Sequence, residues 1–185
     1  MTHTLLIVPG LGDSSKGHWQ NHWLEHFPHA QKVIQKNWNN PQLNDWINNL
    51  NHAIINTEGP IIIVAHSLAA VLIAHWCDKN YNPKVAGALL VAPADVDSKE
   101  HTPPETWNFA PIPLISFPFP SVLVTSDNDP YIDSNRAQFL AKKWQSRYYN
   151  IGNKGHLNAA SELGLWHEGQ QLLNDLILSI EQKEN

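Results

Sequence analysis

Short, uninterrupted apolar runs alternate with longer amphipathic stretches along almost the whole chain, and this alternation is the strongest constraint on its fold. The clearest run, Ile61–Val64, follows a Gly-Pro break and consists of β-branched residues. Continuous rather than alternating apolar patterns are typical of strands buried on both faces. Strands that alternate with helices predict an α/β fold, a mostly parallel sheet covered by helices on both faces. The expected strands are 4–8, 31–35, 61–64, 85–91, 121–125 and 147–151.

The helices are predicted from residue spacing. In the stretch 17–27, Trp19, Trp23 and Phe27 recur every four residues, and Pro28 ends the pattern. Further helices are expected at 44–55, 67–79, 133–143 and 162–180. The segment 94–120 has no clean period and is rich in proline, which predicts a loop or small insertion without a large lid domain. It either borders a substrate pocket or lies on the solvent side.

Length and charge narrow the class of protein. At 185 residues, the chain is expected to form one domain, 1–185, with an adequate core. A net charge of −5 without a Lys/Arg cluster argues against nucleic-acid and anionic-membrane partners. No apolar run approaches a membrane span, and the N-terminus does not resemble a signal peptide, so a cytoplasmic location is expected. The single cysteine, Cys77, cannot form an internal disulfide or a Cys-rich zinc site.

The most specific motif runs Ala65-His66-Ser67-Leu68-Ala69, directly between a buried strand and a helix. This is the setting of a nucleophile elbow, a sharp strand-to-helix turn that exposes a serine hydroxyl. Glycine usually stands two residues before and after the serine, and alanine, the next smallest residue, replaces it here. The alternative is that Ser67 is an ordinary helix N-cap.

Partners for an activated serine follow later strands in the order Ser, Asp, His, which is the order of this architecture. Asp127 and Asp129 follow the strand 121–125, and His156 follows the strand 147–151 in a glycine-flanked loop. Carboxyl ends of parallel strands meet at one edge of a sheet, so these groups are expected near Ser67. The alternatives are a capped turn for the acids and a surface loop for His156.

The sequence offers candidates for an oxyanion hole and, more weakly, for a metal site. The backbone N–H groups of Leu68 and of Leu11, in the Gly10-Leu11-Gly12 loop, are the candidate oxyanion donors. The sequence of that loop is a poor match to a phosphate-binding loop. His18, His22 and His26 share a helical spacing that could hold zinc, but no His-Glu-x-x-His motif is present. No metal or cofactor is expected.

These motifs together resemble the α/β-hydrolase superfamily, and more closely its compact small serine hydrolases of the YdeN type. The resemblance extends over nearly the full length and also includes Gly17-His18-Trp19-Gln20. It implies that the acid before the proline, Asp129, is the triad acid. It further implies a metal-independent hydrolase with an acyl-enzyme intermediate, but it does not supply a natural substrate.

The sequence therefore predicts a serine hydrolase that cleaves a small acyl ester or amide with Ser67, His156 and Asp129. Its expected partner is a small-molecule acyl substrate, and a protein partner is left open. Two alternatives remain: a non-catalytic interaction module on a hydrolase fold, and a thioesterase or acyltransferase with the same triad. His66, beside the nucleophile, is interpreted as structural.

Overall fold

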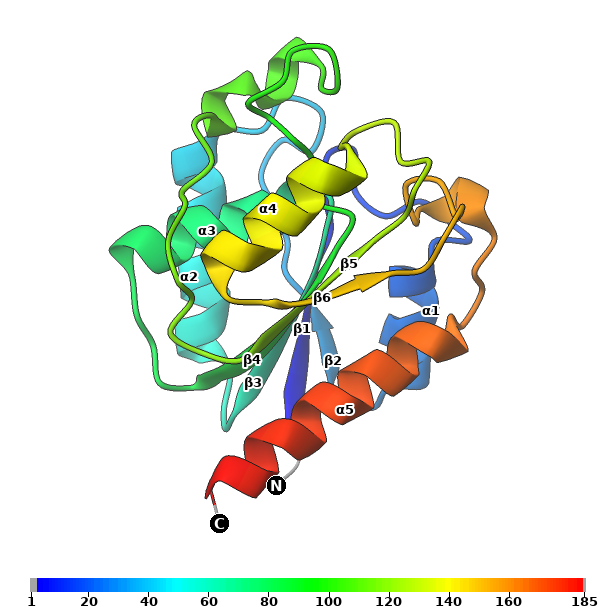
Figure 1. Cartoon of the computed structure of the whole chain (residues 1–185). Coiled ribbons are helices and arrows are strands. Elements are labelled where there is room, and N and C mark those ends of the chain that lie inside the picture. The colour runs from blue at the N-terminus through cyan, green and yellow to red at the C-terminus, as the bar shows by residue number, and fades with distance from the viewer. Residues whose placement is uncertain (1–2, 185) are drawn as a thin grey trace.

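The computed structural model describes residues 3–184 and contains one six-stranded sheet in which every neighbouring pair of strands is parallel (Figure 1). The strand order is β2-β1-β3-β4-β5-β6, so the first strand lies next to the edge strand β2, and the later strands follow in order on its other side. The strands are β1 (Thr4–Val8), β2 (Ala30–Lys32), β3 (Ile61–His66), β4 (Val85–Val91), β5 (Ser121–Thr125) and β6 (Arg147–Asn150).

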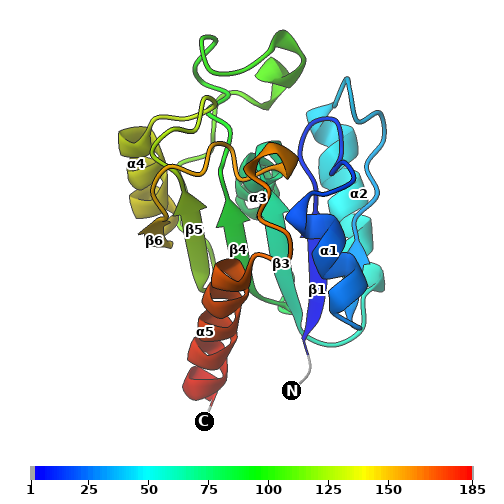
Figure 2. The same ribbon diagram turned by 90° about the vertical axis from the view of Figure 1, so that its right-hand side faces the viewer.

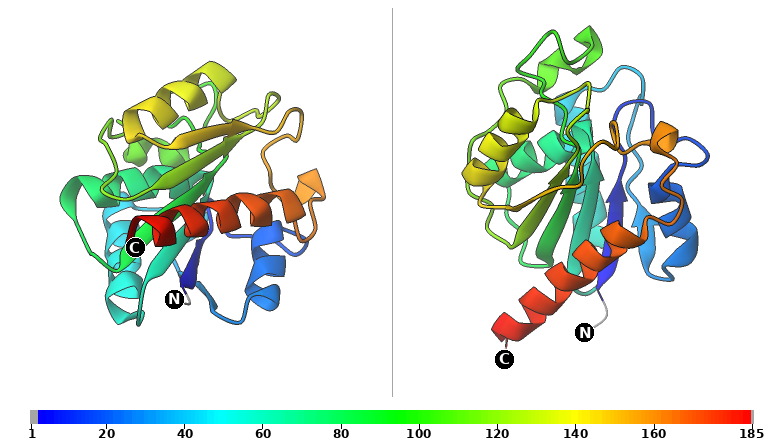
Figure 3. Two further views of the ribbon diagram at one scale, coloured as in Figure 1. Left: turned by 60° about the horizontal axis from the view of Figure 1, so that its bottom comes forward. Right: turned by 45° about the vertical axis from the view of Figure 1, so that its right-hand side comes forward.

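Helices cover both faces of the sheet. They are α1 (Trp19–His26), α2 (Leu43–Asn56), α3 (Leu68–Lys79), α4 (Ser134–Trp144) and α5 (His167–Glu184), with short 3₁₀ helices η1 (Pro104–Phe109) and η2 (Ala159–Ser161). Figure 2 shows α1 and α5 in front of the sheet, and Figure 3 shows α5 crossing the strands on this face. The helices α2, α3 and α4 pack on the opposite face. The predicted α/β class, with helices on both faces, is confirmed.

Alternate residues of each central strand enter two separate cores. In β3, Ile61 and Ile63 pack against α2 and α3, whereas Ile62 and Val64 pack on the side of α1 and α5. Successive side chains of a strand point to opposite faces, and both faces are covered. This explains why the strand sequences are apolar without interruption.

Two predicted elements differ from the structure by three or more residues at one or both ends, and the others agree within two residues. The second strand covers Ala30–Lys32 rather than 31–35. The last helix begins at His167 rather than at residue 162. Glu162, Gly164 and Trp166 have positive φ angles of 49°, 55° and 43°, which a right-handed helix cannot accommodate. The apolar spacing continues through this turn, so spacing alone could not locate the start of the helix.

The proline-rich segment 94–120 packs onto the molecule instead of forming a solvent-side insertion. Phe109, Ile112 and Phe117 are buried in the core on the α2–α4 face. The ring of His75 in α3 makes a 2.7 Å hydrogen bond from Nε2 to the carbonyl of Phe109. The same segment contributes Thr102, Pro103 and Thr106 to the wall of a cavity that Ser67 also lines.

Within the described residues, no helix is both long and apolar enough to cross a lipid bilayer.

Candidate active site

Ser67 lies at a strained turn between β3 and α3. Its φ and ψ angles are 58° and −123°, a conformation that L-residues rarely adopt. It occupies the N-cap position of α3, but its hydroxyl makes no capping hydrogen bond, so Ser67 does not act as an ordinary capping serine. The turn therefore directs the hydroxyl away from the helix, as a nucleophile elbow does.

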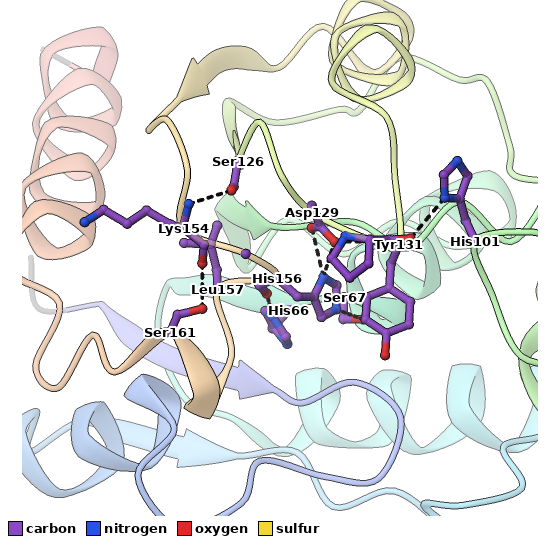
Figure 4. Close-up of polar contacts among 12 residues, drawn as sticks. His66, Ser67, His101, Ser126, Asp129, Tyr131, Lys154, His156, Leu157 and Ser161 are labelled. Atoms are coloured by element: carbon purple, nitrogen blue, oxygen red, sulfur yellow. Dashed lines mark hydrogen bonds and ion pairs between the residues drawn. The ribbon is translucent and has the colours of Figure 1, made fainter.

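The structure brings Ser67, His156 and Asp129 into one hydrogen-bonded chain (Figure 4). His156 Nε2 lies 2.8 Å from Ser67 Oγ, and its Nδ1 lies 2.9 Å from both carboxylate oxygens of Asp129. A carboxylate can only accept, so Nδ1 carries the proton and Nε2 is free to accept from the serine hydroxyl. All three residues are buried although each follows a different strand.

The second acid of the same loop takes no part in this chain. The side chain of Asp127 is exposed and accepts a 2.6 Å hydrogen bond from Asn150 Nδ2. The carboxylate side chain of Asp129 is fully shielded from solvent. The geometry therefore places Asp129 beside the histidine and leaves Asp127 at the surface.

Hydrogen bonds join the loop that carries Asp129 to the loop that carries His156. Asn128 Oδ1 accepts from the backbone N–H of Gly155 at 2.7 Å, and Ser126 Oγ accepts from that of Lys154 at 2.9 Å. Ser161 Oγ in turn donates to the Lys154 carbonyl at 2.6 Å (Figure 4). The distance between the carboxylate and the imidazole is therefore fixed by the backbones that carry them.

Two buried side chains also hold the histidine loop from the opposite side. His66 Nε2 is 2.8 Å from the carbonyl oxygen of His156, and Trp19 Nε1 donates to that of Leu157 at 2.7 Å. Burial, together with the neighbouring His156 and His18, lowers the pKa of His66 well below its ordinary value, so its ring is neutral and donates from Nε2. His66 supports the backbone of His156 and makes no hydrogen bond to Ser67 among the described residues.

Sequence reasoning missed the roles of Trp19 and Gln20, although it placed both in the motif of the family resemblance and Trp19 in a helical pattern. Gln20 is completely buried, and its amide donates to the carbonyls of Val8 and Val64 at 3.2 Å each. Its Oε1 accepts from Ser14 Oγ at 2.6 Å. It thus ties the ends of β1 and β3 to the loop that follows β1. The only signal in the sequence was that Gln20, a polar residue, directly follows Trp19 of the apolar stripe, at a position that a helix can bury.

The two candidate oxyanion donors lie on either side of the elbow. Leu68 is the first residue of α3, and Leu11 lies in the loop after β1. Within residues 3–184, neither backbone N–H has a hydrogen-bond acceptor, and both residues line the cavity that Ser67 faces. Gly10 makes this approach possible, because a Cβ there would lie 2.9 Å from that of Ser67.

The cavity beside Ser67 is small and carries no unpaired charge among its described lining residues. Its volume is about 260 Å³. Neither lysine nor arginine lines it, and the carboxylate of Asp13 is paired with Lys32 at 2.6 Å. Tyr131 forms another part of the wall, with its ring centroid 4.3 Å from that of His156. Such a site suits a small, uncharged ligand.

The zinc hypothesis receives no geometric support. His18 caps α1 with its side chain instead of extending from the helix with His22 and His26. Among residues 3–184, no group of three or more His, Cys, Asp or Glu side chains could hold a metal ion together. Cys77 packs partly against the core, and burial raises its pKa to about 12, as expected of an unreactive thiol.

The parallel sheet, the strained serine after β3, and the histidine and acid after later strands together define an α/β-hydrolase fold. A family model described as serine hydrolase matches residues 5–175, and the chain belongs to this family.

Solved structures agree with this assignment. A YdeN-like hydrolase from Pectobacterium atrosepticum is 30% identical, with 97% of this chain and 92% of that one covered and a TM-score of 0.85. The ydeN gene product of B. subtilis is 19% identical, with 98% and 100% covered and a TM-score of 0.74. A thermophilic esterase from Thermogutta terrifontis shares the fold at 14% identity, with 97% and 91% covered and a TM-score of 0.68. Curated protein sequences give no match to this chain. The resemblance to YdeN-type hydrolases is thereby confirmed.

Proposed function

We propose that the protein hydrolyses small, uncharged acyl esters, or the corresponding amides, through a covalent acyl-enzyme on Ser67. The observation that carries this proposal is the 2.8 Å contact between Ser67 Oγ and His156 Nε2 at the wall of an open cavity. A serine hydroxyl is a weak nucleophile unless an adjacent base accepts its proton. Here the base is present, and Asp129 orients it.

In the first half of the reaction, His156 Nε2 takes the proton of Ser67 as Oγ attacks the acyl carbonyl. The N–H groups of Leu68 and Leu11 donate to the oxyanion that forms. Asp129 stays ionised and stabilises the imidazolium. The imidazolium then gives its proton to the departing alcohol or amine, which leaves the acyl group on Ser67.

In the second half, water replaces the leaving group. His156 removes a proton from the water, whose oxygen attacks the acyl carbonyl. The tetrahedral intermediate collapses, the bond to Ser67 Oγ breaks, and the imidazolium returns the proton to that oxygen. The products are a carboxylic acid and the free serine, so the cycle consumes one water.

The chemical class of substrate follows from the cavity. A volume of about 260 Å³ holds a short acyl chain and part of a leaving group but not a long lipid. An anionic acyl group would meet no lysine or arginine among the lining residues to offset its charge. Short-chain neutral esters are therefore the substrates to test first.

A fluorophosphonate probe tests whether the serine is activated, because such probes react with serines that have a functional base. We expect the probe to add to one site, Ser67, as mapped by peptide mass spectrometry. The His156→Ala variant should lose this labelling while it keeps its fold by circular dichroism. His22→Ala, at a half-buried position of α1 that does not line the cavity, is the matched control and should label like the natural chain. No labelling of the folded natural protein would favour the non-catalytic interaction module.

Substitution of Gly10 tests the oxyanion hole. A Cβ at this position would lie 2.9 Å from Ser67 Cβ, 3.0 Å from the His66 carbonyl and 3.3 Å from the Leu68 nitrogen. These are backbone and elbow atoms, which cannot move aside without displacing the nucleophile. We expect Gly10→Ala to reduce kcat for a short ester by about 10²-fold or more, the range for a lost oxyanion donor.

The control for Gly10→Ala is Gly59→Ala. Gly59 has a positive φ of 72°, and a Cβ there meets nothing within 4 Å. This variant should lose stability through backbone strain but keep its turnover. Near-normal turnover by Gly10→Ala, measured at a temperature where both variants are folded, would remove Leu11 from the oxyanion hole.

A further inference from the structure

His18 is held with a fixed tautomer at the beginning of α1. Its Nδ1 accepts a 3.1 Å hydrogen bond from the backbone N–H of Gln20 and thereby caps the helix. A neutral imidazole has one acceptor nitrogen and one donor nitrogen. Because the cap uses Nδ1 as the acceptor, the proton resides on Nε2, which becomes a hydrogen-bond donor.

The imidazole of His18 is also held in its neutral form. Burial and the nearby His156 lower its pKa to about 4, although Asp13 acts in the opposite direction. Only 4% of the residue's surface is exposed. At neutral pH, His18 thus presents an uncharged N–H in an orientation set by the helix cap.

This N–H has no partner among the described residues, yet it is open to the cavity beside Ser67. Among the described residues, two buried side-chain atoms have neither a hydrogen-bond partner nor contact with solvent: Thr125 Oγ1 and Trp166 Nε1. His18 Nε2 also has no partner but is not among them, so solvent reaches it. His18 lines the same cavity as Ser67. Its ring centroid is 4.7 Å from that of His66, which lies 4.9 Å from that of His156.

The two threonine hydroxyl groups of the wall have already donated their protons. Thr102 Oγ1 donates to the Ser98 carbonyl at 3.0 Å, and Thr106 Oγ1 donates to the Pro103 carbonyl at 2.8 Å. They offer a ligand only acceptor lone pairs. His18 Nε2–H is a donor at the cavity without an acceptor among the described residues, and a purely hydrocarbon ligand that excludes water from it would leave it unsatisfied.

We propose that His18 is a specificity-determining residue whose Nε2–H binds an oxygen acceptor on the substrate, in addition to the reacting carbonyl. The proposal rests on the proposed hydrolase function and narrows its substrate class. It selects small neutral esters with an ether, hydroxyl or carbonyl oxygen over plain alkyl esters of the same size. A site built to hydrogen-bond a substrate discriminates against the analogue that lacks the polar group, because the buried partner then stays unpaired.

Two pairs of p-nitrophenyl esters of matched chain length test this proposal. Methoxyacetate is compared with butyrate, and 3-methoxypropanoate with pentanoate, so that each pair exchanges one CH₂ for an ether oxygen. The kcat/KM ratio of ether to alkyl ester is measured for the natural chain and for His18→Asn. Dividing the ratio of the natural chain by that of the variant cancels the difference in intrinsic reactivity between the two esters of a pair. Asparagine is a good N-cap and can keep the hydrogen bond from Gln20.

We expect the ether preference to fall about fivefold to tenfold in His18→Asn for at least one pair, the effect of one lost hydrogen bond. His22→Asn, one turn further along α1, is the matched control and should keep the natural ratio. Should the Asn protein fail to fold, His18→Ser, which also caps helices, replaces it. Equal ratios in the natural chain and the variant for both pairs would overturn the role of His18.

Failure of the proposed function would look different. A natural chain that cleaves none of the four esters and does not react with the fluorophosphonate has no activated serine, and the hydrolase proposal itself then fails. A natural chain that reacts and cleaves all four esters, with ratios that His18→Asn leaves unchanged, refutes only the specificity proposal.

Discussion

Replacement of Ser67 by alanine is expected to reduce turnover of a short p-nitrophenyl ester by at least about 10³-fold. Removal of the nucleophile of a Ser-His-Asp triad leaves only the catalysis that binding and the oxyanion hole provide. In this chain, Ser67 Oγ is the atom next to His156 Nε2, at 2.8 Å. Without the hydroxyl, the base has no nucleophile to activate and no acyl-enzyme can form.

The same substitution should leave the fold almost unchanged. The Ser67 hydroxyl makes no helix-capping bond, and its hydrogen bond to His156 is a single interaction. Loss of one such bond costs about 1 kcal/mol, which corresponds to a melting temperature within about 4 °C of the natural protein. Ser179→Ala on α5, where the hydroxyl bonds to the Leu176 carbonyl, is the control and should keep full turnover. Substantial esterase activity in a folded Ser67→Ala protein would refute the nucleophile assignment.

The fold could be predicted well because the sheet is covered on both faces. Such strands need apolar side chains at every position, and the chain gives four clear runs of this kind: 4–8, 61–64, 85–91 and 121–125. The edge strands β2 and β6 are shorter and more polar, and their signal was correspondingly weaker. The start of α5 was misplaced because positive φ angles at Glu162, Gly164 and Trp166 delay the helix, although the apolar spacing continues through them.

The candidate site was predictable in outline for a different reason. Parallel strands place all their carboxyl ends at one edge, so chain order alone brought Ser67 together with the loops after β5 and β6. Spacing could not choose between Asp127 and Asp129, and the choice came from the family resemblance. The structure supplies the physical distinction, because the carboxylate of Asp129 is buried against His156, whereas Asp127 is exposed.

Residues that hold the site through long-range hydrogen bonds could not be predicted. Trp19 meets the Leu157 carbonyl across 138 positions of sequence, and His66 meets that of His156 across 90. Apolar spacing assigns an indole to the core but does not say which carbonyl its N–H will reach. One short motif illustrates this, because its three consecutive residues have three different roles. His18 caps a helix, Trp19 supports the histidine loop, and Gln20 joins two strands.

Replacement of Asp129 by asparagine is expected to reduce kcat about 10⁴-fold while the site stays in place. Asparagine has nearly the same shape, and its Oδ1 can keep the 2.9 Å bond from the Tyr131 backbone N–H. Its amide would then face His156 Nδ1 as a donor. The imidazole would have to accept there and carry its proton on Nε2, where it could no longer take the proton of Ser67.

Asp127→Asn is the matched control because it makes the same chemical change two residues away in the same loop. Asp127 is exposed and bonds to Asn150 Nδ2, so its replacement should leave kcat within about twofold of the natural value. The comparison requires only steady-state turnover of a short ester and a melting curve for each variant. Equal losses of kcat in both variants would indicate a general effect of charge at this loop. A large loss of kcat only in Asp127→Asn would show that Asp127, and not Asp129, is the acid of the triad. A loss of kcat only in Asp129→Asn is expected if the carboxylate of Asp129 fixes the tautomer of His156. The exposed carboxylate of Asp127 does not contact the imidazole and cannot determine which nitrogen carries the proton.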